Sequence, residues 1–211
     1  MKKYVLIDDK IKKFKKKITV SADKSLSIRW VLMAAQAVGQ SIAYNLLNSD
    51  DVNNALNAVK KLGVKVIKKK NLCQINGVGL NGFSLKNNTI IDAGNSGTLA
   101  RLIIGVLAKS NKTIVLKGDK SLSKRDFSRV IKPLKKFGLS FKLSKNNLPL
   151  KFKGTNYLSP IKYEELKGSA QVKSCILLAA LNTPGKTIIR CFPSRDHTER
   201  LFQFLNLPIK I

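Results

Sequence analysis

The sequence predicts an α/β fold (α+β in the arrangement of its elements) in which buried helices run through the centre and β-sheets lie outside. Two observations predict it. A β-α-β-α-β-β pattern recurs about every 70 residues, and the first helix of each unit is apolar on all sides. A helix that is hydrophobic all round must be buried all round. Because the last unit stops before its closing strands, we expect two complete units and one incomplete unit.

The first helix of each unit opens with polar residues and continues as an apolar segment. These helices are predicted at residues 24–35, 95–107 and 169–180, and the strand after each at residues 41–47, 112–117 and 186–191. Short apolar runs bounded by turn residues are typical of strands. Three similar helices therefore occupy equivalent positions in the three units.

The second helix of each unit is more amphipathic and follows a serine that is a candidate N-cap. These helices are predicted at residues 49–62, 123–137 and 194–205, and closing strands at 64–68 with 72–76 and at 139–144 with 148–152. Gly63 and Gly138 are predicted to end the first two of these helices. The units then span about residues 21–80, 85–155 and 160–211. Only residues 206–211 follow the last helix, so we interpret the chain as a truncated fragment.

Composition supports a packed core, with 44% hydrophobic residues, and gives a formal net charge of +28. Such an excess of cations indicates either a polyanionic partner or a lysine-rich surface. The lysines are spread along the whole chain, and no zinc-finger spacing or aromatic RNA-binding motif is present. The densest basic run, residues 10–17, leads into a strand-like stretch at 18–20. We therefore expect no nucleic-acid partner.

Cysteine spacing indicates neither a zinc site nor a disulfide framework. Cys73, Cys175 and Cys191 form no CxxC pair, and we expect each to be a small apolar filler in a reducing compartment. No signal-peptide pattern and no apolar stretch of membrane-spanning length occurs. We expect a cytoplasmic protein without membrane contact.

Three parallel buried helices would bring their N-termini to one face, where free N–H groups and helix dipoles favour anions. The residues at the three starts suit an anion site: Lys24, Ser25 and Arg29; Asn95, Gly97, Thr98 and Arg101; Ser169, Gln171 and Lys173. The alternative is that Ser25, Ser96 and Ser169 are ordinary N-caps. The coincidence at three equivalent positions favours a shared anion site.

The same segments resemble, in order, five sequence blocks of the 5-enolpyruvylshikimate-3-phosphate synthases. The matching residues are 23–29, 94–98, 124–125, 168–174 and 195–199, within a resemblance that runs from about residue 15 to the end. The resemblance implies an inside-out α/β barrel, or α-β prism, in a chain about twice as long. Residues 1–20 would then be a strand segment of the other lobe, and residues 21–211 the N-terminal lobe.

The family transfers the enolpyruvyl group of phosphoenolpyruvate to the 5-hydroxyl of shikimate-3-phosphate and releases phosphate. This is a step of the shikimate pathway toward chorismate and the aromatic amino acids. The resemblance implies no metal and no organic cofactor, and a monomeric complete enzyme whose partners are these two small molecules.

The resemblance also implies residue roles. Lys24 would contact both substrates and take part in proton transfer. Ser25, Arg29, Ser169, Ala170, Gln171 and Arg195 would bind shikimate-3-phosphate, with Arg29 on its carboxylate and Ser169 and Ala170 on its phosphate. Gly97, Arg125 and Gln171 would bind phosphoenolpyruvate.

The sequence departs from the family pattern at two places. Ser21 and Ala22 replace a Pro-Gly pair before the first block. Asp126 replaces a proline beside Arg125, where its carboxylate would weaken a phosphate contact. The family's acid and base carboxylates lie in the absent half, so we expect the isolated chain to be inactive. We interpret Asp50 and Asp51 as helix-capping acids and His197 as structural.

Three other functions remain as alternatives. A UDP-N-acetylglucosamine enolpyruvyl transferase would carry a reactive cysteine, which residues 117–124 lack. An RNA 3′-phosphate cyclase of related architecture would need a catalytic histidine near the end of a longer chain, a role that His197 does not fill. A basic nucleic-acid binder would show a steep dependence of affinity on salt.

Overall fold

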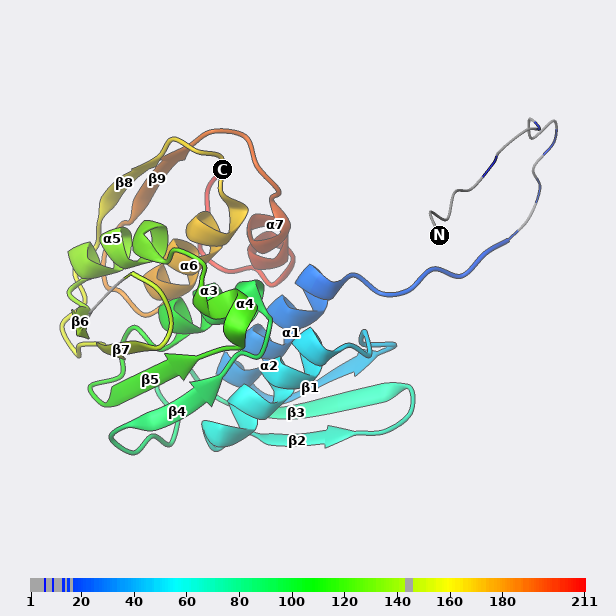
Figure 1. The fold of residues 1–211 in the computed structure, drawn as a ribbon, viewed down its shortest axis with the longest axis horizontal. Coiled ribbons are helices and arrows are strands. Elements are labelled where there is room, and N and C mark those ends of the chain that lie inside the picture. Colours follow the sequence, from blue (N-terminus) through cyan, green and yellow to red (C-terminus); the bar gives the residue numbers. More distant parts are fainter. Residues whose placement is uncertain (1–5, 7–8, 10–12, 14, 16, 143–145) are drawn as a thin grey trace.

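The three predicted first helices lie next to one another in the interior of the protein (Figure 1). In the computed structural model, which describes residues 6, 9, 13, 15, 17–142 and 146–211, they are α1 (Lys24–Gln36), α3 (Gly97–Val106) and α6 (Ala170–Ala180). The α3 and α6 helices pack along each other, and α1 contacts α3. Most residues of all three are buried, which confirms the predicted central helices.

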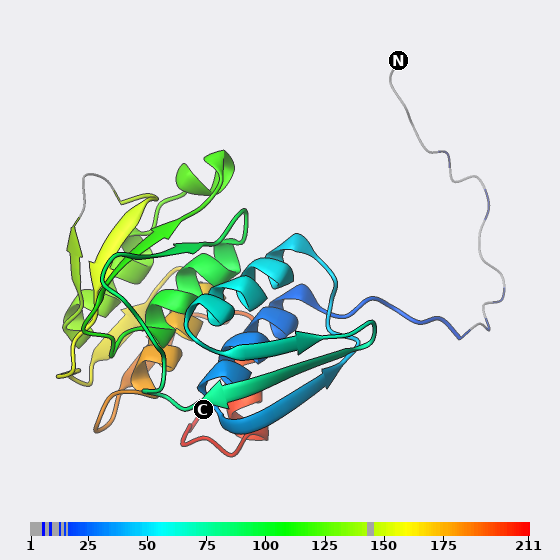
Figure 2. The same ribbon diagram turned by 90° about the horizontal axis from the view of Figure 1, so that it is seen from below.

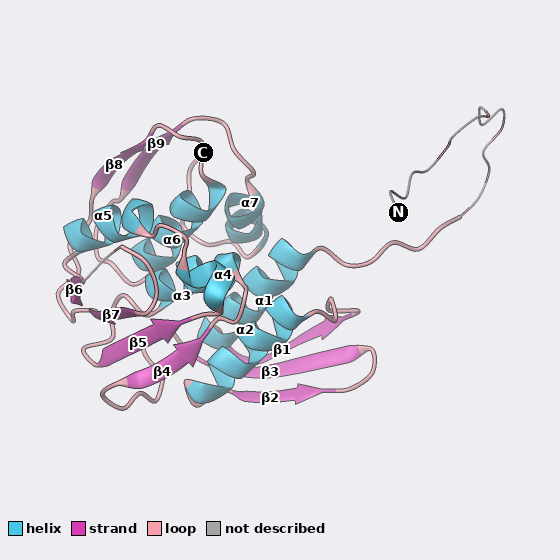
Figure 3. Ribbon diagram, viewed as in Figure 1, coloured by secondary structure: helices cyan, strands magenta, loops and turns pink. Residues whose placement is uncertain are grey.

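The described part of the chain forms three separate sheets around these helices (Figure 3). The first sheet has the strand order β1 (Val38–Tyr44), β3 (Leu72–Val78), β2 (Lys65–Lys68). The second sheet has the order β4 (Thr89–Asp92), β5 (Thr113–Lys117), β7 (Leu150–Lys153), β6 (Ser140–Lys142). The third sheet pairs β8 (Lys162–Glu165) with β9 (Ile188–Cys191). The pairs β4–β5 and β8–β9 are parallel, and the other pairs are antiparallel. The recurrence of a parallel pair around α3 and around α6 confirms the internal repeat.

The second helices cover the sheets and the central helices. They are α2 (Asp50–Lys61), α5 (Ser128–Phe137) and α7 (His197–Phe204). Both α1 and α2 pack against the β1–β3–β2 sheet (Figure 2). Gly138 ends α5 with φ 107°, and Gly63 follows α2 with φ 85°, so both predicted C-terminal glycines are confirmed.

The prediction of one helix over residues 123–137 is wrong. The chain forms a short α4 (Lys120–Ser123), capped by Asp119, and α5 begins only at Ser128. Asp126 accepts hydrogen bonds from the N–H and the hydroxyl of Ser128, and Phe127 is buried. Local side-chain bonding of this kind offers the backbone a turn in place of a helix.

The predicted start of the third amphipathic helix is also wrong. It begins at His197 rather than at Ser194, and Asp196 at its N-cap position makes no side-chain capping bond. The described residues 17–20 form no strand, and most of residues 1–16 lie outside the described residues. The assignment of residues 1–20 to another lobe therefore stays a prediction.

Two of the three cysteines are the expected apolar fillers. Cys73 in β3 and Cys175 in α6 are free and buried, and burial raises the pKa of the Cys175 thiol to about 12. Cys191 at the end of β9 is exposed, so the prediction of a filler is wrong there. Among the residues that the structure describes, no helix combines the length and apolarity needed to cross a membrane.

The contact between α3 and α6 leaves no room for a side chain at Gly105. A Cβ built there would lie 2.3 Å from the carbonyl oxygen of Cys175 and 3.2 Å from its sulfur. Because the nearest atom belongs to the backbone of the neighbouring helix, it cannot move away as a flexible side chain does. The two helices therefore approach as closely as a glycine allows.

We predict that Gly105→Ala lowers the free energy of unfolding by about 1–3 kcal/mol through overpacking. This loss is expected although alanine normally favours a helix by up to about 1 kcal/mol over glycine. Chemical denaturation measures it, with Asn57→Ala on the exposed face of α2 as the control. Equal or greater stability of Gly105→Ala would contradict the packing described.

Candidate anion-binding site

The first turn of α1 presents Lys24 at the surface beside an acid from the next helix. Lys24 Nζ lies 2.7 Å from Asp51 Oδ2, and the two side chains are 52% and 17% exposed. Asp23, not Ser25, caps this helix, since its carboxylate accepts the N–H of Leu26. Ser25 is half-buried and makes no cap bond, so its hydroxyl is left for another role.

Helix α2 joins the start of α1 to the turn that precedes α3. Asp51 in its first turn holds Lys24, and Asn54 lies one turn further on and donates to the carbonyl of Ala93 at 3.4 Å. The approach is close, because a Cβ on Gly94 would lie 2.2 Å from the amide nitrogen of Asn54. This places the beginning of α3 near the beginning of α1.

Two guanidinium groups converge on Gly97 at the start of α3. A Cβ built on Gly97 would lie 2.9 Å from Arg101 Nη1 and 3.0 Å from Arg125 Nη1. Burial, followed by the positive charges of Arg125 and Arg129, lowers the pKa of Arg101. The charged form of Arg101 is therefore disfavoured by its surroundings, and a bound anion would reverse that effect.

Asp126 lies beside this cluster, and its negative charge opposes the lowering of the pKa of Arg101. Its carboxylate is bonded to Ser128, and those bonds hold its pKa below the usual value. Arg125 is exposed at the surface. Asp126 and Arg125 form no direct ion pair, so the effect of Asp126 on a phosphate contact of Arg125 stays a prediction.

Gln171 connects the start of α3 with the start of α6. Its side-chain oxygen accepts Arg101 Nη1 at 2.9 Å, and its side-chain nitrogen donates to the hydroxyl of Thr98 at 3.0 Å. The sequence predicts Gln171 between two ligands, and the structure places it between two groups of side chains that were predicted to bind anions. Its geometry links these groups directly.

Beyond Gln171, a cavity of about 340 Å³ opens at the start of α6. Four of its lining residues were predicted: Ser169, Ala170, Gln171 and Arg195. Ser194 also lines it, and within the described part of the chain its buried hydroxyl has no hydrogen-bond partner. A buried hydroxyl without a partner at a cavity wall is available to a ligand.

Arg129 and Lys167 complete the positive lining of this cavity, which has no acidic residue. The sequence analysis missed both, together with Ser194. Arg129 lies on α5 and reaches the cavity across the fold, so no local motif marks it. Gly168 precedes Ser169 with φ 63°, a backbone conformation that suits glycine in the turn before α6.

Two predicted anion-binding cations lie in the interior. Arg29 is 4% exposed, and it donates to Ser25 O, Ser174 Oγ and Thr198 Oγ1. Burial and the charge of Arg195 lower its pKa. Three of the five guanidinium N–H donors of Arg29 are thus engaged. A contact of Arg29 with a substrate carboxylate stays a prediction.

The prediction that Lys173 belongs to the open anion site is wrong. It is paired with Glu199 of α7, and both side chains are 9% exposed. The second carboxylate oxygen of Glu199 has no hydrogen-bond partner within the described residues. Because Lys173 lies one turn inside α6, its side chain points to the helix that covers this turn and not to the surface.

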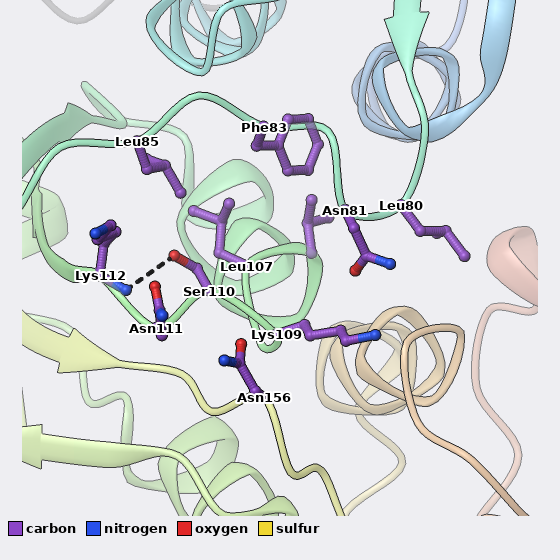
Figure 4. Close-up of a pocket in the computed structure, with 11 residues that line it drawn as sticks. Leu80, Asn81, Phe83, Leu85, Leu107, Lys109, Ser110, Asn111, Lys112 and Asn156 are labelled. Atoms are coloured by element: carbon purple, nitrogen blue, oxygen red, sulfur yellow. Dashed lines mark hydrogen bonds between the residues drawn. The ribbon is translucent and has the colours of Figure 1, made fainter.

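The predicted residues therefore gather in two adjoining groups at one end of the central helices. One group surrounds Gly97, the other surrounds Ser169, and Lys24 with Asp51 lies at the neighbouring start of α1. Asp51 is a partner of Lys24, and His197 begins α7. A separate cavity of about 250 Å³ beside Phe83 and Leu107, at the other end of α3, contains none of the predicted site residues (Figure 4).

Comparison with known proteins gives consistent results. The sequence model of the family described as EPSP synthase (3-phosphoshikimate 1-carboxyvinyltransferase) matches residues 9–211. A 3-phosphoshikimate 1-carboxyvinyltransferase of Ruthia magnifica subsp. Calyptogena magnifica is 43% identical over 195 residues, which are 92% of this chain and 45% of the relative. One of Zymomonas mobilis is 42% identical over 190 residues, covering 89% of this chain and 42% of the relative.

The solved structures agree with the sequence comparisons. An EPSP synthase of Acinetobacter baumannii superimposes with a TM-score of 0.87 at 37% identity, covering 94% of this chain and 45% of that protein. This confirms the predicted inside-out α/β architecture. The chain spans about half the length of the curated relatives it matches.

We predict that Glu199→Ala lowers the free energy of unfolding by about 3–5 kcal/mol, because it leaves the charge of Lys173 buried without a partner. Thermal or chemical denaturation measures the change. The control is Arg200→Ala on the same helix, whose partner Asp196 is at the surface, and which should leave the midpoint unchanged. Similar midpoints for Glu199→Ala and the parent chain would show that Lys173 reaches water.

Proposed function

The chain belongs to the EPSP synthase family, and on that premise we propose that it is the N-terminal half of an enzyme that transfers an enolpyruvyl group. The donor is phosphoenolpyruvate, the acceptor is the 5-hydroxyl of shikimate-3-phosphate, and phosphate is released. This half supplies mainly the binding site for shikimate-3-phosphate.

The observation that carries this proposal is the pairing of two anion-binding groups through Gln171. Arg101 and Arg125 converge at Gly97, and Gln171 links Arg101 to the cavity at Ser169. A reaction between two phosphorylated substrates needs two such groups close together. Fixed cations and helix N-termini stabilise negative charge without having to reorganise during the reaction.

Each group suits one substrate. The cavity at Ser169, Ala170 and Arg195 holds the phosphate of shikimate-3-phosphate, with Ser25 on its sugar ring. Gly97 and Arg125 bind the phosphate of phosphoenolpyruvate. Lys24, at the neighbouring start of α1, contacts both substrates and takes part in proton transfer. Asp51 holds its ammonium in place until a substrate replaces that contact.

The groups that complete catalysis belong to the other half of the family's chain. The assignment of residues 1–20 to that half is part of this proposal, and closure of the two halves around the substrates excludes water. The alternative acceptor, UDP-N-acetylglucosamine, has no support among the relatives reported above, each of which is named as a 3-phosphoshikimate 1-carboxyvinyltransferase.

We predict that shikimate-3-phosphate raises the melting temperature of the chain and that Lys24→Ala abolishes the rise. At a ligand concentration 100 times the dissociation constant, binding stabilises a protein by about 2.7 kcal/mol. Differential scanning fluorimetry measures the rise, and Lys68→Ala is the control. Lys68 is an exposed lysine whose hydrogen bonds go to Asn48 and Asn53, neither of which is a predicted site residue, so this variant should keep the full rise.

The same assay separates the proposal from a nucleic-acid function. If DNA stabilises the chain with a steep dependence on salt and shikimate-3-phosphate does not, the enolpyruvyl transfer assignment fails. Equal responses of Lys24→Ala and Lys68→Ala would remove Lys24 from the site.

A further inference from the structure

A buried carboxylate lies directly behind the cavity at the start of α6. Glu165, the last residue of β8, is only 4% exposed, and its Oε1 accepts Arg129 Nη2 at 2.7 Å. Arg129 belongs to the first turn of α5, lines the cavity and is 42% exposed at its side chain. One end of this guanidinium is therefore held in the protein while the rest reaches the surface of the cavity.

The second oxygen of Glu165 holds the turn that enters α6. Its Oε2 accepts the backbone N–H of Ser169 at 2.6 Å. Ser169 in turn caps α6 through its own hydroxyl. A single carboxylate thus fixes both the guanidinium from α5 and the backbone that forms the floor of the cavity.

Glu165 is ionised at neutral pH. Burial by itself would raise the pKa of this carboxyl, but the bonds from Ser169 and Arg129 outweigh it and hold the pKa below its usual value. Hydrogen bonds to the charged form of a carboxyl have this effect. Arg129 is therefore held by a full negative charge, which gives a shorter and stronger bond than a neutral acceptor would.

The charge balance of the cavity fits a phosphate group. Its lining contains three cations, Arg129, Lys167 and Arg195, and no acid. The one carboxylate behind it, Glu165, reduces three positive charges to two. A phosphate monoester carries close to two negative charges at neutral pH, so cavity and ligand are matched in charge.

We propose that Arg129 is a phosphate-binding residue of this cavity and that Glu165 is the positioning residue that orients it. An arginine held on one side by a carboxylate keeps its remaining N–H groups in a fixed plane, which suits a phosphate. The identity of the phosphate ester as shikimate-3-phosphate rests on the proposed function, whereas the recognition of phosphate rests on the cavity alone. A purely structural role, in which Arg129 only ties α5 to β8, is the competing interpretation.

The test compares two ligands that differ only in the phosphate, shikimate-3-phosphate and shikimate. Titration calorimetry or NMR on the full chain measures both affinities. We expect Arg129→Gln to weaken binding of shikimate-3-phosphate about tenfold or more, as loss of a charge-assisted hydrogen bond does, and to leave binding of shikimate unchanged. If Arg129 had a purely structural role, Arg129→Gln would lower the affinity for both ligands equally.

Glu165→Gln provides the second variant. Its amide accepts only one of the two bonds, so Arg129 or the N–H of Ser169 loses its partner. We expect a smaller, several-fold loss for shikimate-3-phosphate, and a double variant that loses less than the product of the two single losses, since Glu165 acts largely through Arg129. The matched control is Glu164→Gln. Glu164 precedes Glu165 in the sequence, its side chain is 60% exposed, and its Oε1 lies 3.8 Å from Arg190 Nη1, so this variant should bind shikimate-3-phosphate as the parent does.

Each outcome decides the proposal. Unchanged affinity of folded Arg129→Gln for shikimate-3-phosphate overturns it, and so does an equal loss for both ligands. If Arg129→Gln does not fold, Arg129→Lys keeps the charge, loses the planar fork and should still lose affinity for the phosphate ester. If the parent chain does not bind shikimate-3-phosphate, the proposed function fails. Inorganic phosphate then serves as the probe, and its stabilising effect should disappear in Arg129→Gln; a retained effect overturns the role of Arg129.

Discussion

The close approach of α3 and α6 is the constraint on which the rest of the site depends. At one end, Gly105 leaves the helices so near each other that no side chain fits between Gly105 and the backbone of Cys175. At the other end, Gln171 of α6 bonds both Arg101 and Thr98 of α3. The spacing of two packed helices therefore sets the distance between the group at Gly97 and the cavity at Ser169. A wider spacing would separate the two groups and with them the two proposed substrates.

Electrostatics divides the cations of this region into two sets. Lys173 is buried and neutralised by Glu199, and Arg29 is buried among hydroxyl and carbonyl oxygens. Arg101, Arg125, Arg129 and Arg195 instead lie around the site, where burial and then the charges of Arg125 and Arg129 lower the pKa of Arg101. A cluster of like charges is unfavourable without a counter-ion. In the proposed function an anionic substrate supplies this counter-ion, so the arrangement that costs stability would provide affinity.

Much of the fold could be predicted from the sequence because each unit repeats one local pattern. The apolar segments from Leu99 and from Val172 admit only buried helices, and the structure shows both helices buried. The direction in which a side chain points was not predictable. Lys173 and Arg29 turn inward because α7 covers them, a fact of tertiary packing. Glu165 and Arg129 are 36 residues apart and meet only in the folded chain, so no motif shows them.

The central claim is that the starts of α1, α3 and α6 form one binding site. An NMR titration of the isotope-labelled chain with shikimate-3-phosphate tests it most directly. The account predicts that backbone amide signals near Ser25, Gly97 and Ser169 shift together and saturate with a single dissociation constant, while signals at the opposite ends of the same helices, near Gln36 and Ala180, stay in place. Shifts confined to one of the three helices, or scattered over the lysines of the outer sheets, would contradict it.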